Sequence, residues 1–110
     1  MNISIENVGE KIILRLDGRL DATSSPLLEN KLSHYVDERY GAILIDFLRV
    51  DYLSSAGLRL LLSITKKLKA RGGLLILFNM NDEVMEIIKM AGFDRILAIF
   101  PDEKDALAAT

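Results

Sequence analysis

The sequence predicts a single α/β domain in which helices cover a mixed β-sheet. Segments with strand-like apolar spacing alternate along the chain with segments of helical spacing. Two internal runs, 42–47 and 74–78, are almost unbroken apolar stretches, as expected of strands covered on both faces. The chain has 110 residues, and no linker or repeat divides it, so one domain over 1–110 is expected. The predicted order is β-β-α-β-α-β-α-β-α, with about five strands and about four helices.

The first two strands are predicted to form a hairpin. Residues 2–8 alternate polar and apolar side chains, which is the period of a half-buried strand. The pair 9–10 suits a tight turn, and 11–17 forms the second strand. Gly18 is expected to end that strand.

A helix is predicted to start at Ser25-Pro26, because serine caps free N–H groups and proline suits the first helical position. Apolar residues then recur at helical spacing, and Gly41 is the expected stop. The apolar run 42–47 follows as a central strand.

The second half of the chain repeats this alternation. A helix begins near Ser54–Ser55 and ends before Gly72-Gly73, and the strand 74–78 follows. Asn81 caps a third helix, which Gly92 closes. A short strand at 96–100 precedes a last helix that opens at Pro101-Asp102 and runs to about Ala108.

Composition narrows the range of functions. The net charge of −2 provides no general attraction to nucleic acid or to anionic lipid. The absence of cysteine excludes disulfides and thiolate ligands, and the N-terminus resembles no signal peptide, so a cytoplasmic protein without membrane insertion is expected. The basic residues between Lys66 and Arg71 are explained as a solvated helix end that complements the helix dipole.

The sequence offers little for catalysis, and no enzyme activity is expected. The lone histidine, His34, falls inside the first predicted helix and is interpreted as a surface residue. A serine hydrolase would need a Gly-x-Ser-x-Gly elbow followed by a histidine, and neither is present. No metal-ligand cluster or P-loop appears, so no metal and no cofactor is predicted.

The most informative segment is 50–58, where two hydroxyls and a glycine stand between a buried strand and a helix. This is the carboxyl edge of the predicted sheet, where open α/β sheets place their binding sites. One interpretation is that a serine here only caps the helix. The other is that Ser54 or Ser55 carries a phosphate, which the free N–H groups and the partial positive charge of a helix N-terminus would accommodate.

An ordered set of motifs resembles the STAS domain family, which includes bacterial anti-sigma factor antagonists. The resemblance rests on Gly18-Arg19-Leu20-Asp21, Ile43-Leu44-Ile45-Asp46, Leu53-Ser54-Ser55-Ala56-Gly57-Leu58-Arg59 and the stretch 72–79. It spans nearly the whole chain and implies a STAS-like fold.

The resemblance implies that the chain binds an anti-sigma factor that is also a serine kinase, and so frees a sigma factor for transcription. The kinase would phosphorylate a loop serine and abolish binding, and a serine phosphatase would restore it. Counted back from Gly57, the acceptor is Ser55, with Ser54 as second choice. Ser54 stands where the best-known members have aspartate, and Ala56 replaces their second hydroxyl. The implied partner-binding residues are Asp21, Ser54, Ser55, Ala56, Gly57 and Arg59.

Three further polar residues have structural explanations beside any functional one. Asp21 follows the second strand and should approach the Ser54–Ser55 loop, where it either contacts the partner or caps the next helix. Asp46 ends the predicted central strand and is expected to support the serine-bearing loop by a hydrogen bond. Asn79 is explained by loop hydrogen bonding.

Two alternatives to an anti-sigma factor antagonist stay open. The chain could be a STAS subunit of another complex, such as a lipid-transport system or a stress-sensing assembly, without reversible phosphorylation. It could also bind a small ligand or nucleotide at the helix N-terminus.

Overall fold

The computed structural model describes residues 1–38 and 40–110. Its elements follow the predicted order: β1 (Asn2–Val8), β2 (Lys11–Leu20), α1 (Ser25–Asp37), β3 (Ala42–Leu53), α2 (Ser55–Ala70), β4 (Leu74–Phe78), α3 (Asp82–Met90), β5 (Ala98–Phe100) and α4 (Glu103–Ala108). Over these described residues the strands form a five-stranded sheet in the order β1-β2-β3-β4-β5. β1 runs antiparallel to β2, as the hairpin prediction requires, and the other neighbours are parallel. The predicted mixed α/β sheet is therefore confirmed.

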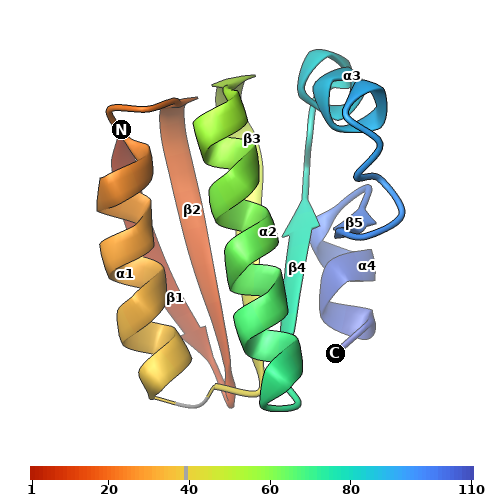
Figure 1. The fold of residues 1–110 in the computed structure, drawn as a ribbon. Helices are drawn as coiled ribbons and strands as arrows, with labels where there is room; N and C mark the ends of the chain where they lie inside the picture. Colours follow the sequence, from red (N-terminus) through yellow and green to blue (C-terminus); the bar gives the residue numbers. More distant parts are fainter. Residues whose placement is uncertain (39) are drawn as a thin grey trace.

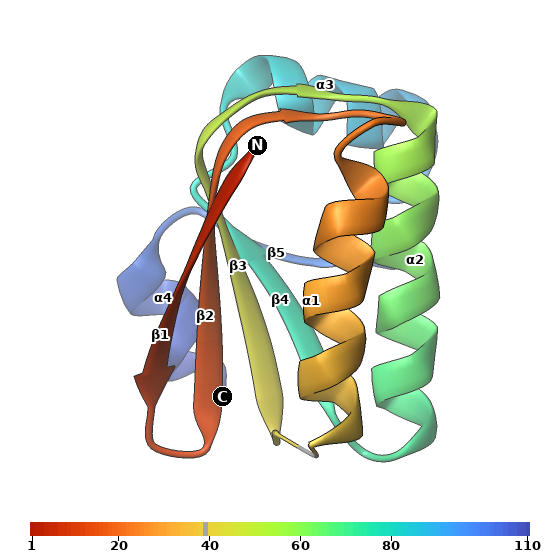
Figure 2. The same ribbon diagram turned by 90° about the vertical axis from the view of Figure 1, so that its left-hand side faces the viewer.

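The helices are divided between the two faces of the sheet and one of its ends. α1 and α2 lie side by side on one face, and α4 lies on the other (Figures 1 and 2). Successive side chains of β2 point to opposite faces of the sheet. Ile12 and Leu14 belong to the larger core under α1 and α2, and Ile13 belongs to the smaller core under α4. α3 lies at the end where β3 and β4 finish, which is also where α2 begins (Figure 2).

β2 and β3 are longer than predicted, because the two strands stay paired with each other beyond the predicted end of each. The pairing of β3 with β4 stops at Asp46 and Phe78, whereas β2 and β3 stay paired as far as Leu20 and Leu53. Gly18 does not end β2; it adopts a φ of 125° beside a register shift within the ladder. β5 is shorter than predicted, since it begins at Ala98.

The start of α1 also differs from the prediction. Ser24 precedes the helix, and Ser25 and Pro26 are its first two residues. Ser24 makes no side-chain cap hydrogen bond; its hydroxyl donates to the Arg19 carbonyl at 2.6 Å and accepts from the Asp21 N–H at 2.9 Å. These bonds bind the connection between β2 and α1 into a compact turn instead of capping the helix.

Candidate functional site

The end of β2 and the start of α2 are in direct contact, as predicted for the two loops. The Ser54 N–H donates to the Leu20 carbonyl oxygen at 2.9 Å. Gly57, in the first turn of α2, is so close to β2 that a Cβ atom there would lie 2.9 Å from the same oxygen. Only glycine permits this approach without displacement of a backbone. The two segments that carry the expected partner-binding residues therefore form one surface.

The two serines of this surface have different environments. Ser54 is half-buried in an extended conformation, and its hydroxyl oxygen accepts the Gly57 N–H at 3.2 Å as the N-cap of α2. Ser55 is the first residue of α2 and is exposed. The capping interpretation thus applies to Ser54, and Ser55 presents its side chain to solvent.

The start of α2 is suited to a negative group. The first turn of α2 contains no acidic residue. The partial positive charge of a helix N-terminus is consequently not offset by a carboxylate within that turn. A charge added to Ser55 would lie at this position.

A groove lies between the first turns of α1 and α2, beside the serines. It has a volume of about 360 Å³ and is lined by Ala22, Ser25, Pro26, Glu29, Ala56, Arg59, Leu60 and Ser63. Two of the expected partner-binding residues, Ala56 and Arg59, are among them, and Arg59 is exposed. Gly57 is buried, so its contribution is close packing against β2 and not a surface for contact.

Asp21 caps the turn that leads into α1. Its Oδ1 atom accepts the N–H groups of Thr23 at 3.0 Å and Ser24 at 3.1 Å, and its Oδ2 lies 3.6 Å from Arg19 Nε. The hydrogen bonds from Ser24, Thr23 and the Ser24 hydroxyl, with the nearby Arg19 charge, hold the pKa of Asp21 below its usual range. Asp21 therefore stabilises the turn before α1 and does not cap the helix itself, and its contact with a partner stays a prediction.

Asp46 does not bond the serine-bearing loop, and that expectation is wrong. β3 continues beyond Asp46, so its carboxylate is buried within the sheet. One oxygen accepts from Arg15 Nη1 at 2.8 Å. The other accepts the Leu48 N–H at 2.9 Å and Asn79 Nδ2 at 3.1 Å. Asp46 therefore supports the junction of β2, β3 and the loop after β4, where Asn79 adopts a φ of 62°.

The partner of Asp46, Arg15, is the centre of a cluster that the sequence did not indicate. Its guanidinium lies 2.7 Å from Glu103 on α4 and 3.0 Å from Glu6 on β1 as well. These carboxylates, Glu103 foremost, raise the pKa of Arg15. The four charged groups come from separate parts of the chain, so only the fold brings them together. Arg15, on β2, thereby links α4 to the sheet and adds an ion pair between β2 and β1.

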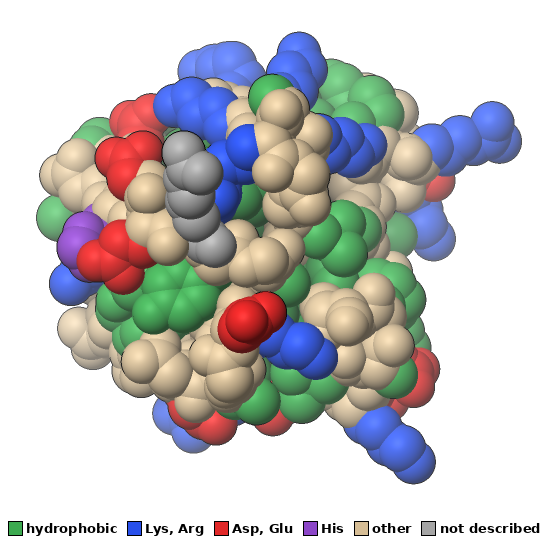
Figure 3. Space-filling model, turned by 90° about the horizontal axis from the view of Figure 1, so that it is seen from below, with side chains coloured by type: hydrophobic (Ala, Val, Ile, Leu, Met, Phe, Trp, Pro, Cys, Tyr) green, Lys and Arg blue, Asp and Glu red, His purple; other side chains and the backbone are tan. Residues whose placement is uncertain are grey.

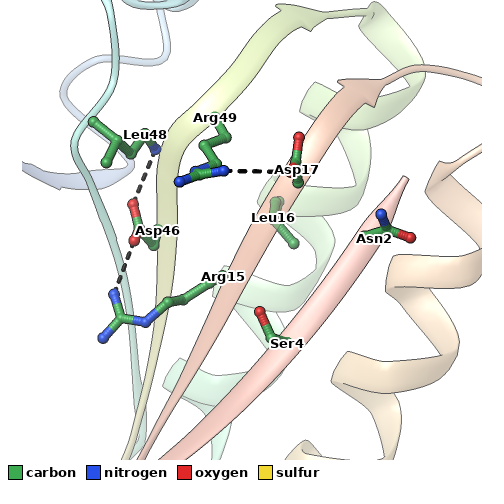
Figure 4. Close-up of a pocket in the computed structure, with 8 residues that line it drawn as sticks. All are labelled: Asn2, Ser4, Arg15, Leu16, Asp17, Asp46, Leu48 and Arg49. Carbon is green, nitrogen blue, oxygen red and sulfur yellow. Dashed lines mark hydrogen bonds and ion pairs between the residues drawn. The ribbon is translucent and has the colours of Figure 1, made fainter.

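A hollow of about 310 Å³ lies beside this cluster, on the sheet face opposite α2. It is lined by Asn2, Ser4, Arg15, Leu16, Asp17, Asp46, Leu48 and Arg49. In Figure 4 the side chains of Arg15 and Asp46 point toward each other, as do those of Arg49 and Asp17. The charged groups in the hollow are thus directed at one another, which is the arrangement of a structural cluster.

His34 is exposed, as interpreted from the sequence, and its Nε2 lies 3.0 Å from a carboxylate oxygen of Glu38, the residue that follows α1. The end of the molecule where α2 finishes carries Lys and Arg side chains with hydrophobic and uncharged groups between them, not a continuous basic surface (Figure 3). In residues 1–38 and 40–110 no group of three or more His, Asp or Glu side chains is arranged to hold a metal ion. Among the helices that the structure describes, none is both long and apolar enough to span a bilayer.

Comparison with known sequences identifies the family that the sequence motifs resemble. The model of the STAS domain family matches residues 2–106. A Bordetella bronchiseptica protein, BtrV, which bears the provisional name of anti-sigma factor antagonist, is 32% identical over 99% of this chain and 93% of its own length. The anti-sigma-B factor antagonist of Listeria monocytogenes is 30% identical over 90% of each chain.

Solved structures have the same fold. The anti-sigma factor antagonist SpoIIAA in its unphosphorylated form superposes with a TM-score of 0.83, at 24% identity, over 98% of this chain and 95% of its own. A structure of Bacillus SpoIIAA in the phosphorylated form gives a TM-score of 0.75 at 24% identity, over 98% of both chains. With the family model matched along almost the whole sequence, this chain belongs to the STAS domain family.

Proposed function

We propose that this chain is an anti-sigma factor antagonist that is switched off by phosphorylation of Ser55. It would bind an anti-sigma factor with serine kinase activity and thereby release a sigma factor. Two relatives carry the antagonist name, and a fold neighbour has been solved in a phosphorylated form. The observation that carries the proposal is the difference between the serines: Ser54 caps α2, and Ser55 is exposed at the same helix end.

The proposed switch acts by charge on an otherwise unchanged surface. A phosphate on Ser55 adds about −1.5 to −2 charge at neutral pH. The start of α2 accommodates that charge, since helix N-termini favour anions, so the domain does not need to refold. The same charge would repel an acidic partner surface or prevent the burial of an apolar one. Binding is thus lost without any change in the fold.

The proposed partner surface comprises the exposed and half-exposed residues around the groove between α1 and α2. These are Asp21, Ser54, Ser55, Ala56 and Arg59. A serine phosphatase would have to reach the same serine to reset the switch, and the exposure of Ser55 permits this. The protein itself would act as a binding module in the cytoplasm, not as an enzyme.

A pull-down from native lysate with and without ATP tests the proposal, using wild type, Ser55→Ala and Ser55→Asp, with Thr110→Asp as a control at another exposed hydroxyl residue. Mass spectrometry would identify the partners and any phosphate. We expect wild type, Ser55→Ala and Thr110→Asp to retain a kinase-type anti-sigma factor. Ser55→Asp should bind at least about tenfold more weakly, or about 1.4 kcal/mol.

The outcomes of this experiment distinguish the alternatives that involve a protein partner. Phosphate found on Ser54 would show that Ser54, and not Ser55, is the phosphorylated residue. Recovery of transporter or scaffold subunits regardless of the residue at position 55 would indicate another STAS complex. Equal binding of the anti-sigma factor by Ser55→Ala and Ser55→Asp would refute the switch.

A further inference from the structure

β1 is an edge strand whose outer side carries no neighbour among the described elements. It is the first strand of the sheet and pairs only with β2. Figure 2 shows no other element in front of it. An edge strand presents a row of unpaired N–H and C=O groups, which can pair with another strand. The inner side of β1 is paired with β2 along its whole length without a register shift.

β1 has few of the features by which proteins usually protect an edge. Such features are charged side chains, above all lysine, and also proline, a bulge or a very short strand. The seven residues Asn2–Val8 contain neither proline nor lysine, and their ladder contains no bulge. Their only charged residue is Glu6, which is paired with Arg15 at 3.0 Å. The opposite edge strand, β5, has three residues and offers much less backbone for pairing.

We propose that β1 pairs antiparallel with β1 of a second copy of this chain, centred on Ile5, so that two sheets become continuous. In this symmetric register Ile5 faces Ile5, and the remaining pairs are Ser4 with Glu6, Ile3 with Asn7, and Asn2 with Val8. Every residue of the strand therefore has a partner. The pairs also match in face, because opposed residues in a sheet project to the same side.

Charge and apolar contact select this register over its neighbours. A centre on Glu6 would place two carboxylates opposite each other, which destabilises a strand pair. A centre on Ser4 would leave Val8 without a partner residue. With Ile5 at the centre, Glu6 faces an uncharged serine. The two Ile5 side chains, each 36% exposed in the single chain, would cover one another.

The absence of cysteine from this chain allows a direct test. Opposed residues in antiparallel strands have Cα atoms about 4.5–5.5 Å apart, within the range of a disulfide bond. Ile5→Cys should therefore form a covalent dimer under oxidised glutathione. The control is Val8→Cys, for which the two thiols would be separated by about 20 Å in the same dimer. We expect cross-linking of Ile5→Cys to be at least about tenfold faster.

Sedimentation over a concentration series provides the second measurement. The wild type should form dimers as concentration rises into the millimolar range. Ile5→Lys should remain monomeric, because two ammonium groups would be opposed at the centre of the pair. The matched control is Leu27→Lys, which makes the same change at an exposed apolar residue on α1. Circular dichroism would confirm that both variants fold.

Three results would overturn this proposal. One is a wild type that stays monomeric at every concentration, which would show that β1 does not pair with a second copy of the chain. The second is a dimer that persists in Ile5→Lys, since another surface would then form it. The third is cross-linking of Ile5→Cys no faster than of Val8→Cys. None of these outcomes depends on the proposed anti-sigma function.

Discussion

Replacement of Gly57 by alanine should destabilise the protein, although alanine is the better helix former. A Cβ atom at this position would lie 2.8 Å from Leu20 Cγ, 2.9 Å from the Leu20 carbonyl oxygen and 2.9 Å from Leu53 Cδ1. Ordinary contacts begin at 3.4 Å, so the ends of β2 and β3 would have to retreat by about 0.5 Å. One of the crowded atoms belongs to the backbone and cannot rotate away.

The magnitude follows from two opposed effects. Overpacking of a close-packed core typically costs about 1–3 kcal/mol. The gain from replacing glycine by alanine in a helix is at most about 1 kcal/mol. We therefore expect a net loss of about 1–2 kcal/mol in the free energy of unfolding. For a domain of this size that loss lowers Tm by about 4–8 °C.

Urea denaturation and calorimetry would measure this change, with Gly41→Ala as the control. A Cβ atom at Gly41 meets no atom within 4 Å, so that variant should be neutral or slightly more stable. A Gly57→Ala protein as stable as the wild type would refute the close approach of α2 to β2. The same displacement should weaken binding to any partner that contacts the Ser54–Ser55 segment.

Substitutions at three further residues test the structure by their effect on stability, and two of them have a control variant at another residue. Ser54→Ala should lose about 1 kcal/mol of unfolding free energy with the N-cap, and Ser55→Ala almost none; equal losses in urea titrations would contradict the assigned cap. Arg15→Ala should cost about 2 kcal/mol, because it leaves a buried carboxylate without its charged partner. Arg49→Ala should cost under about 0.5 kcal/mol, because its ion pair with β2 is exposed and 3.9 Å long. The pKa of Asp21 is lowered in the folded state, so its contribution to stability is present above its unfolded pKa of about 4 and is lost as pH falls through the lower folded value. Asp21→Asn should therefore reduce the loss of stability on acidification, and an unchanged dependence of Tm on pH would exclude this role.

Local patterns predicted most of the elements and much of the site. The bounds of β1 and β4 agree with the alternation at 2–8 and the apolar run at 74–78. Ser54 and Asn81 cap their helices, as residue type and position indicated. The contact between the loop after β2 and the start of α2 was also predicted. Such features depend on residues close in sequence, or on the rule that parallel strands end at the same edge of a sheet.

The features that the sequence did not predict depend on contacts between strands and helices that are distant along the chain. β3 continues past its apolar run because β2 continues beside it, and a backbone ladder does not need an apolar pattern. Asp46 was assigned to the wrong neighbour because Arg15 and Asn79 approach it from distant parts of the chain. The sequence by itself therefore determined the class of fold and the serine-bearing helix start. Tertiary structure alone decided that Ser54 is the half-buried cap and Ser55 the exposed hydroxyl, since exposure depends on what packs around each side chain.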